Sequence, residues 1–177
     1  FRGWSAEEGF ELWRTDGTPE GTRRVKDLVD GADSSRPDAF RQLGSRAIFL
    51  ASAADGTLEL WSTDGTSHGT QSLLRGAASD RDPWGDPAGT YFVAGGRLYF
   101  GYDDGVHGVE LWSSDGSAAG THFEADLNPG LGSSRPSDYV VSGNDLVFLA
   151  DDGIHGAVPW RLSLAGGPIC LATSTSA

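Results

Sequence analysis

The chain has 177 residues and a formal net charge of −12, from 25 acidic and 13 basic side chains. Such a surface repels phosphate backbones and anionic membranes, so we expect no nucleic-acid partner. Hydrophobic residues make up 38% of the chain and aromatic residues 10%, which is too many for a disordered protein, and no apolar run approaches the roughly 20 residues of a membrane-spanning helix.

The sulfur-containing residues set two further limits. Cys170 is the single cysteine, so neither an intrachain disulfide nor a cysteine-based metal cluster is expected. Methionine is absent, even at position 1. We therefore interpret the chain as a processed mature fragment or an excised segment of a longer protein.

An internal repeat is the strongest pattern in the sequence. Glu-Leu-Trp occurs at 11–13, 59–61 and 110–112, and a degenerate copy ends at Trp160. In the first three copies an Asp-Gly pair and a hydroxyl residue begin three positions after the tryptophan, and a Gly-Thr pair follows. The tryptophans are 48, 51 and 48 residues apart, a period typical of repeat architectures.

In chain order the repeats span about 1–28, 38–75, 89–127 and 137–173. The third copy shows the pattern of short β-prone segments, predicted as strands at 90–94, 98–100, 109–112 and 121–127 and separated by Gly-rich or Asp-Gly turns. The second and fourth copies predict the same four strands. The first copy begins at the second strand of the pattern, so we expect only three strands there.

The predicted fold is all-β. Segments 47–50 and 146–149 are apolar on both faces, so the sheets that contain them must be covered on both sides. Four-stranded sheets at this period indicate a β-propeller with about four blade-equivalents in a single region, 1–177. A β-sandwich would explain the strands but not their spacing. The chain is either a compact four-bladed ring or part of a larger propeller completed by another segment or copy, and we favour the larger one.

The repeated motif resembles that of the ELWxxDGT repeat family, bacterial repeats found mostly in large exported proteins. The resemblance covers the chain from about Phe10 to Trp160, although no Asp-Gly follows Trp160. It implies an extracellular or cell-surface location. It implies no activity, because the family has no common one. The Asp-Gly-Thr turns are similar to the Asp-box hairpins of sialidase-type propellers, which are structural there.

Several repeated residues are expected to serve the fold. The aspartates of the Asp-Gly-Thr turns accept hydrogen bonds within their own turn, and the alternative is a calcium site with one carboxylate per turn. The residues concerned are Asp16, Asp64 and Asp115. The repeated tryptophans are expected to pack between sheets; these are Trp13, Trp61, Trp112 and Trp160. The repeated glutamates share their strands, and we expect them to accept hydrogen bonds from a neighbouring N–H or arginine rather than to catalyse glycoside hydrolysis.

In a propeller, the turns between second and third strands lie on the same face as the connections between blades. This face is the candidate ligand-binding surface. Its residues are Asp103, Asp104, His107, Asp151, Asp152, His155, Arg36, Arg135 and Trp84. The alternative is that Asp-Asp-Gly-x-His-Gly only builds a bulged hairpin.

The leading functional hypothesis is a non-catalytic exported propeller that binds a protein or glycan, or acts as a scaffold for other segments of its parent protein. One alternative is the cleaved part of a secreted hydrolase with its site on the loop-rich face. Another is a calcium-stabilised structural module. Apart from calcium, no cofactor is expected, because the sequence has no nucleophile elbow, phosphate loop or dinucleotide fingerprint.

Overall fold

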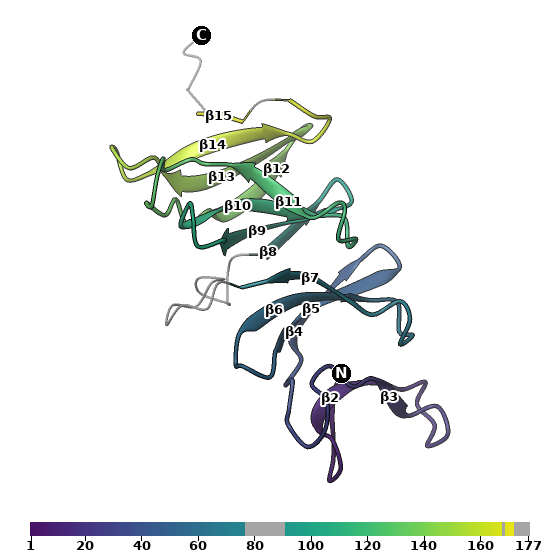
Figure 1. Cartoon of the computed structure of the whole chain (residues 1–177). Coiled ribbons are helices and arrows are strands. Elements are labelled where there is room, and N and C mark those ends of the chain that lie inside the picture. The colour runs from purple at the N-terminus through teal and green to yellow at the C-terminus, as the bar shows by residue number, and fades with distance from the viewer. Residues whose placement is uncertain (77–90, 168, 172–177) are drawn as a thin grey trace. The chain divides into compact units, whose positions relative to one another are not determined.

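A computed structural model of the chain describes residues 1–76, 91–167 and 169–171. These residues form fifteen strands and no helix, and the strands make four antiparallel sheets. The predicted all-β class is therefore confirmed. Each sheet is a meander whose neighbouring strands follow one another in the chain (Figure 1).

Sheet 1 has three strands and sheet 2 has four. Sheet 1 consists of β1 (Arg2–Ser5), β2 (Gly9–Arg14) and β3 (Arg23–Lys26). Sheet 2 consists of β4 (Asp38–Leu43), β5 (Arg46–Ser52), β6 (Leu58–Thr63) and β7 (Gln71–Arg75). The first sheet has the three strands expected from the phase of the repeat.

Sheets 3 and 4 each have four strands. Sheet 3 consists of β8 (Tyr91–Ala94), β9 (Arg97–Asp103), β10 (Val109–Ser114) and β11 (His122–Ala125). Sheet 4 consists of β12 (Ser137–Ser142), β13 (Asp145–Asp151), β14 (Ala157–Ser163) and β15 (Cys170–Leu171). The predicted second strand of the third copy, 98–100, extends in both directions, because cross-strand pairing with β10 continues to Asp103.

The tight turns follow from glycine. Gly95 and Gly96 connect β8 to β9 with φ of 55° and 77°, a backbone conformation that residues with a Cβ adopt only with strain. This two-residue turn fixes the register, in which Ala94 pairs with Arg97. The Gly-Gly hairpin expected from the sequence is therefore present.

The repeat also fixes which residues face each other across the strands. In sheets 2, 3 and 4 the repeated tryptophan lies opposite a phenylalanine of the preceding strand. The pairs are Phe49 with Trp61, Phe100 with Trp112, and Phe148 with Trp160. These three phenylalanines are at most 1% exposed, so the aromatic pair belongs to the core of each sheet.

The chain divides into two compact units. The first contains sheets 1 and 2, with the turn Gly116–Thr121 grouped with it, and the second contains sheets 3 and 4. The core of the first unit joins Leu12 of β2 to Phe49 and Ala51 of β5. The core of the second joins Leu111 of β10 to Phe148 of β13 and Leu162 of β14. Within each unit, apolar faces of adjacent sheets therefore pack against each other.

Candidate functional site

The connection between sheets 1 and 2 is held by a buried carboxylate. Glu11 on β2 is fully buried. Its Oε1 accepts the backbone N–H of Ser35 at 2.8 Å, and its Oε2 accepts the Ser35 hydroxyl at 2.7 Å and the Leu28 N–H at 2.8 Å. Because one carboxylate bonds both ends of the connection, the segment 28–35 has a defined path over the sheet.

The second unit repeats this arrangement. Glu110 on β10 is also fully buried, and it accepts hydrogen bonds from the N–H and hydroxyl of Ser134 and from the N–H of Leu127, all between 2.6 and 2.9 Å. The expectation that the repeated glutamate accepts neighbouring N–H groups is met. The connection that follows Glu59 falls largely in 77–90, outside the described residues. Glu59 itself lies 3.8 Å from Nε of Arg75.

Each serine that is bonded to a buried glutamate, Ser35 or Ser134, is followed by an arginine in an unusual backbone conformation. Arg36 and Arg135 have φ of 48° and 46°, in the left-handed region that non-glycine residues seldom adopt. Their N–H groups donate to the carbonyls of Phe10 and Val109, which holds the backbone in place. Both arginine side chains are exposed. The backbone of each predicted arginine is thus held by a hydrogen bond, and its side chain is exposed to solvent.

The turn between β9 and β10 is organised by Asp104. Its Oδ1 accepts the N–H groups of Val106 and His107 at 2.9 Å, and its Oδ2 accepts Nδ1–H of His107 at 2.8 Å. Asp103 accepts the Gly105 N–H. The His107 ring also stacks on Phe123, with centroids 4.9 Å apart. The hydrogen bonds of this Asp-His pair therefore stay inside the hairpin.

The turn between β13 and β14 is built in the same way. Asp152 accepts the N–H groups of Ile154 and His155 and the Nδ1–H of His155, at 2.6 to 2.9 Å. Asp151 accepts the Gly153 N–H at 2.7 Å. Two copies of one hairpin, with no shift of register in the strands beside the turn, thus occur at corresponding places in sheets 3 and 4.

The electrostatics of the two turns follow from these bonds. Burial alone would raise the pKa of Asp104, but the hydrogen bonds from His107 and the backbone outweigh it and lower the pKa. The same hydrogen bond raises the pKa of His107. Hydrogen bonds from His155 and the backbone lower the pKa of Asp152 to about 2. At neutral pH both aspartates are therefore anionic acceptors and cannot serve as proton donors.

The connection 128–133 lies between these two turns. A Cβ placed on Gly108 would come within 2.1 Å of the Gly132 carbonyl, and one on Gly153 within 2.5 Å of Oδ1 of Asn128. The predicted residues of the second unit are thus brought to one loop surface. They are Asp103, Asp104, His107, Arg135, Asp151, Asp152 and His155.

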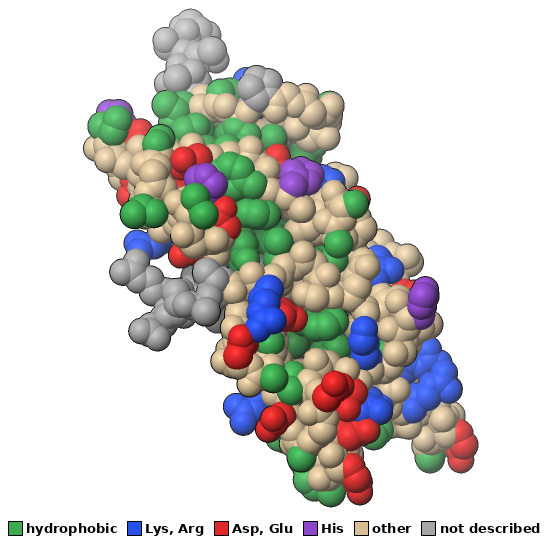
Figure 2. Space-filling model, in the orientation of Figure 1, with side chains coloured by type: hydrophobic (Ala, Val, Ile, Leu, Met, Phe, Trp, Pro, Cys, Tyr) green, Lys and Arg blue, Asp and Glu red, His purple; other side chains and the backbone are tan. Residues whose placement is uncertain are grey.

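Three aliphatic side chains stand at the tips of this loop surface. Val106 is 60% exposed, Ile154 is 81% exposed, and Leu131 of the intervening connection is 85% exposed. Figure 2 shows hydrophobic, acidic and histidine side chains gathered over this part of the second unit. These three residues were not predicted from the sequence. For Val106 and Ile154 the sequence carried a usable pattern, because both occupy the variable position of Asp-Asp-Gly-x-His-Gly, which is aliphatic in both copies.

The corresponding surface of the first unit is more polar. A cavity of about 490 Å³ lies between the connection 29–36 and the turn 52–56, and Asp33, Ser34 and Arg36 line it. Asp55, in the shorter turn, forms an ion pair with Arg75. The ninth predicted residue, Trp84, lies outside the described residues.

The Asp-Gly-Thr turns are closed by their own aspartates. Oδ1 of Asp64 accepts the N–H and the hydroxyl of Thr66 at 2.8 and 2.7 Å, and Asp16 bonds Thr18 in the same way. Asp115 occupies the matching position in the third copy. No group of three or more histidine, cysteine, aspartate or glutamate side chains placed to hold a metal ion occurs in 1–76, 91–167 or 169–171.

The four repeated tryptophans have related surroundings. The Trp61 ring stacks on Phe49 at 6.4 Å, and the Trp112 ring meets Tyr102 edge-on at 5.0 Å. Trp13 covers Gly3, where an added Cβ would lie 2.4 Å from the indole. Trp160 donates from Nε1 to the carbonyl of Ala150. These contacts lie within the tryptophan's own sheet. Trp61 also packs between sheets as expected, because Nζ of Lys26 on β3 lies 5.7 Å from its ring centroid.

No protein-family model matches the chain, and no curated protein matches it. Within the described residues there is also no helix of the length and apolarity needed to cross a membrane.

Proposed function

We propose that this chain is a non-catalytic protein-binding module that recognises its partner through the loop surface of the second unit. We further propose that it belongs to the ELWxxDGT repeat family, that it is exported, and that its four sheets are blades of a β-propeller. The observation that carries the binding proposal is the exposure of Val106, Leu131 and Ile154 at the tips of one fixed loop surface.

The propeller proposal is supported by how the sheets repeat. Sheets 2, 3 and 4 each carry the repeated tryptophan on their third strand, and sheet 1 carries Trp13 on β2, followed by one further strand. The packing of Leu12 against Phe49 in the first unit matches that of Leu111 with Phe148 in the second. Sheets that cover one another face to face at a constant period are typical of propeller blades. The family proposal is supported by the repeated motif alone.

The aliphatic tips favour binding over catalysis. A catalytic carboxylate needs a free oxygen or a tuned proton, whereas Asp104 and Asp152 each accept three hydrogen bonds from their own hairpin. Exposed aliphatic groups on a preorganised backbone can instead be buried by a partner at little entropic cost. In this proposal the hydrogen bonds hold the backbone of the two hairpins in place, and the exposed aliphatic side chains contact the partner.

The charge of the surface indicates the class of partner. Two aspartates precede each hairpin tip, Asp103 and Asp104 before Val106 and Asp151 and Asp152 before Ile154, and the whole chain has a net charge of −12. Complementarity therefore favours a protein segment that combines aliphatic or aromatic side chains with lysine or arginine. A glycan is less favoured, because the described tips are aliphatic and sugar rings stack preferentially on aromatic faces.

A displayed peptide library selected against the immobilised chain tests this function. We expect enrichment of peptides with basic residues beside apolar ones. Binding of these peptides should be lost in the triple variant Val106→Ser, Leu131→Ser, Ile154→Ser. It should be kept in a control variant that changes three exposed valines of β8 and β12 instead, Val93→Ser, Val140→Ser, Val141→Ser. If the triple loop variant bound the peptides as well as the parent chain does, the proposed site would be wrong. Binding to a glycan array that is lost in the same variant would show that the partner is a glycan and not a protein.

A further inference from the structure

The cavity of about 490 Å³ in the first unit lies between the connection 29–36 and the turn that follows β5. The connection contributes Asp33, Ser34 and Arg36 to its wall, and the turn contributes small residues between 52 and 56. Its volume is in the range of cavities that hold small ligands. Because most of the lining residues are polar or small, a polar ligand fits this cavity better than an apolar one.

Backbone hydrogen bonds hold both walls of this cavity. The N–H of Ser52 donates to the carbonyl of Ser35 at 2.7 Å, and Ser35 is itself bonded to a buried carboxylate. The N–H of Arg36 donates to the carbonyl of Phe10 at 3.1 Å. The connection and the turn are therefore tied to each other and to sheet 1, so a ligand does not have to order them when it binds.

Two opposite charges line this cavity, and neither is paired. In the part of the chain that the structure describes, the Arg36 guanidinium and the Asp33 carboxylate form no hydrogen bond or ion pair, either with each other or with another residue. Both side chains are exposed, so a ligand can reach them from solvent. An unpaired cation and an unpaired anion on one cavity wall are complementary to a ligand that carries both a carboxylate and an ammonium group.

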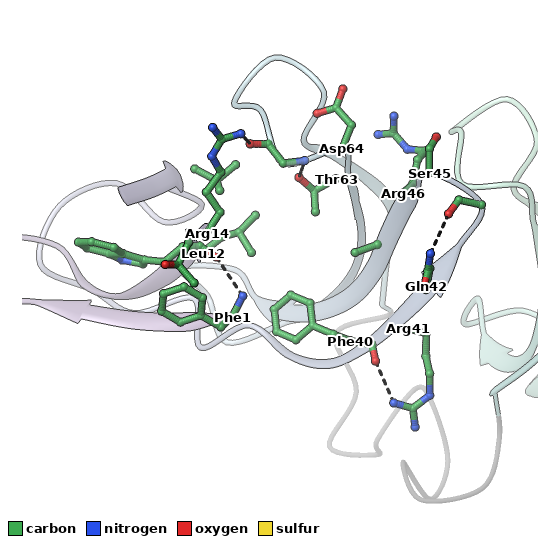
Figure 3. A pocket seen from close by; sticks show the side chains of 16 residues that line it. Phe1, Leu12, Arg14, Phe40, Arg41, Gln42, Ser45, Arg46, Thr63 and Asp64 are labelled. Atoms are coloured by element: carbon green, nitrogen blue, oxygen red, sulfur yellow. Dashed lines mark hydrogen bonds between the residues drawn. The ribbon is translucent and has the colours of Figure 1, made fainter. Parts of the chain in front are cut away.

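The arginines of another cavity in the same unit differ in this respect. Figure 3 shows Arg14 and Arg41 in that cavity, each donating to a backbone carbonyl. Arg46, which lines it too, donates to a serine hydroxyl and to a carbonyl. Those three guanidinium groups hold parts of the fold together, whereas the guanidinium of Arg36 remains available for a ligand.

In the second unit a side chain occupies the corresponding space. Asn128 and Val29 have the same repeat position, one residue after the leucine whose N–H donates to the buried glutamate. A Cβ on Gly132 would lie 2.3 Å from Oδ1 of Asn128, and one on Gly153 would lie 2.5 Å from the same atom. The Asn128 amide therefore lies between the connection and the turn. Val29 lines the cavity of the first unit and has no amide to place there, which leaves that space open.

The carboxylate of the cavity is also specific to the first unit. Asp33 stands directly before Ser-Ser-Arg-Pro in the first connection, and Gly132 stands at the same place in the second. The second unit thus keeps the arginine of the motif, Arg135, but has no carboxylate at this position. The first unit combines an open cavity with both charges.

We propose that this cavity binds a small zwitterion, the amino-acid-like combination of a carboxylate and an ammonium group found in a free amino acid or a dipeptide. The carboxylate of the ligand pairs with the guanidinium of Arg36, and its ammonium group pairs with the carboxylate of Asp33. The hydroxyl oxygen of Ser34 accepts the Phe10 N–H at 2.9 Å, so its own proton can be donated to the ligand carboxylate. This site takes a small molecule in the first unit, whereas the protein-binding surface proposed above lies in the second.

Isothermal titration calorimetry of the full chain with L-alanine and with L-alanyl-L-alanine tests this site. Saturable binding of at least one of the two is expected, and the tighter one identifies the length of the ligand. Acetylation of the amino group removes the ammonium charge, and amidation of the carboxyl group removes the carboxylate. Each capped form should bind at least about tenfold more weakly than the zwitterion, the factor that corresponds to roughly 1.4 kcal/mol.

Variants of the chain assign the two charges. Arg36→Gln and Asp33→Asn each remove one charge and keep the backbone hydrogen bonds of the connection, and each should weaken binding at least about tenfold. Ala54→Phe, at an exposed position of the turn, narrows the cavity without changing a charge and should also weaken binding. Arg23→Gln, at an exposed position of β3, removes the same charge away from the cavity and should keep the parent affinity. Circular dichroism checks that each variant is folded.

Three results would overturn this proposal. They are the absence of saturable binding by both zwitterions, equal affinity for a zwitterion and its capped forms, and equal weakening by Arg36→Gln and Arg23→Gln. The triple loop variant changes the other unit, so it should bind the zwitterion as the parent chain does even where it no longer binds library peptides. The two proposals therefore fail independently.

Discussion

The buried carboxylate of Glu11 binds both the backbone N–H and the hydroxyl of Ser35, 24 residues further along the chain. Glu110 and Ser134 form the same pair in the second unit, at the same separation. Since each glutamate lies on the third strand position of its repeat and each serine in the connection, this pair links the core of one sheet to the start of the next. The loop surface is thereby tied to the buried part of the fold.

Replacing Glu11 by glutamine should destabilise the first unit. The glutamine amide keeps one acceptor oxygen, but its NH₂ group would face N–H or O–H donors that now bond to the second carboxylate oxygen. Charge-assisted bonds in buried sites contribute about 1.5–3 kcal/mol each, so we expect a loss of about 2–4 kcal/mol in the free energy of unfolding. Urea unfolding measures it. Glu20→Gln, at an exposed position, is the control and should leave the midpoint of unfolding unchanged. An equal effect of both changes would contradict a stabilising role for the hydrogen bonds that Glu11 accepts.

The strands were predictable because residues close together in the sequence determine where each strand begins and ends. Gly95-Gly96 and the Asp-Gly pairs specify turns through backbone conformation, and the alternation between them specifies strands. The sequence also indicated a structural role for Glu11 and Glu110. It did not indicate Ser35 and Ser134 as their partners, because a contact over 24 residues depends on the path of the connection.

The candidate site was predictable in position but not in chemistry. Topology alone brings Asp104, Asp152 and the connection between them to one surface. The hydrogen bonds that occupy both carboxylates depend on the φ and ψ values of each hairpin, which residue types do not specify. The exposure of Leu131 depends on the same three-dimensional detail, and so does the left-handed backbone at Arg135.

Asp152 should contribute to the acid sensitivity of the second unit. Its pKa is lowered to about 2 by the hydrogen bonds from His155 and the backbone. A carboxyl with a depressed pKa in the folded state stabilises the fold above its ordinary value, near 3.8, and this stability is lost as the pH falls toward about 2. Unfolding midpoints measured at stepwise lower pH should therefore fall less steeply in Asp152→Asn than in the parent chain. Ile154→Ser, which keeps the bonds of Asp152, should retain the parent slope, and a flattened slope there would argue against this origin.

Gly69 is required by the Asp-Gly-Thr turn. A Cβ at this position would lie 2.1 Å from the carboxylate oxygens of Asp64, so Gly69→Ala must displace that side chain and break its two bonds to Thr66. We expect a lower midpoint of urea unfolding, because Thr66 loses the acceptor that closes the turn. Ser67→Ala changes an exposed side chain in the same turn and should be neutral in the same denaturation assay. Stability of Gly69→Ala equal to that of the parent chain would show that Asp64 does not hold the turn.

The turn aspartates should not need calcium. Asp64 and Asp16 each direct Oδ1 at two donors of the next hydroxyl residue, and each turn contributes a single aspartate. A bound ion would stabilise the folded state in proportion to its occupancy. We therefore expect the melting temperature to be the same with excess EDTA and with millimolar Ca²⁺. A rise of several degrees with Ca²⁺, removed by Asp64→Asn, would instead support the calcium-stabilised module.

Phe49 and Phe1 occupy the same repeat position opposite a tryptophan, yet Phe49 is 1% exposed and Phe1 is 48% exposed. The difference arises because Phe40 of β4 stacks on Phe49 at 5.1 Å, whereas β1 is the edge strand of sheet 1 among the residues that the structure describes. Phe49→Ala should therefore cost about 3–5 kcal/mol of unfolding free energy, the usual cost for a buried phenylalanine. Phe1→Ala should cost little in the free chain. Equal destabilisation by the two changes would contradict this dependence on burial.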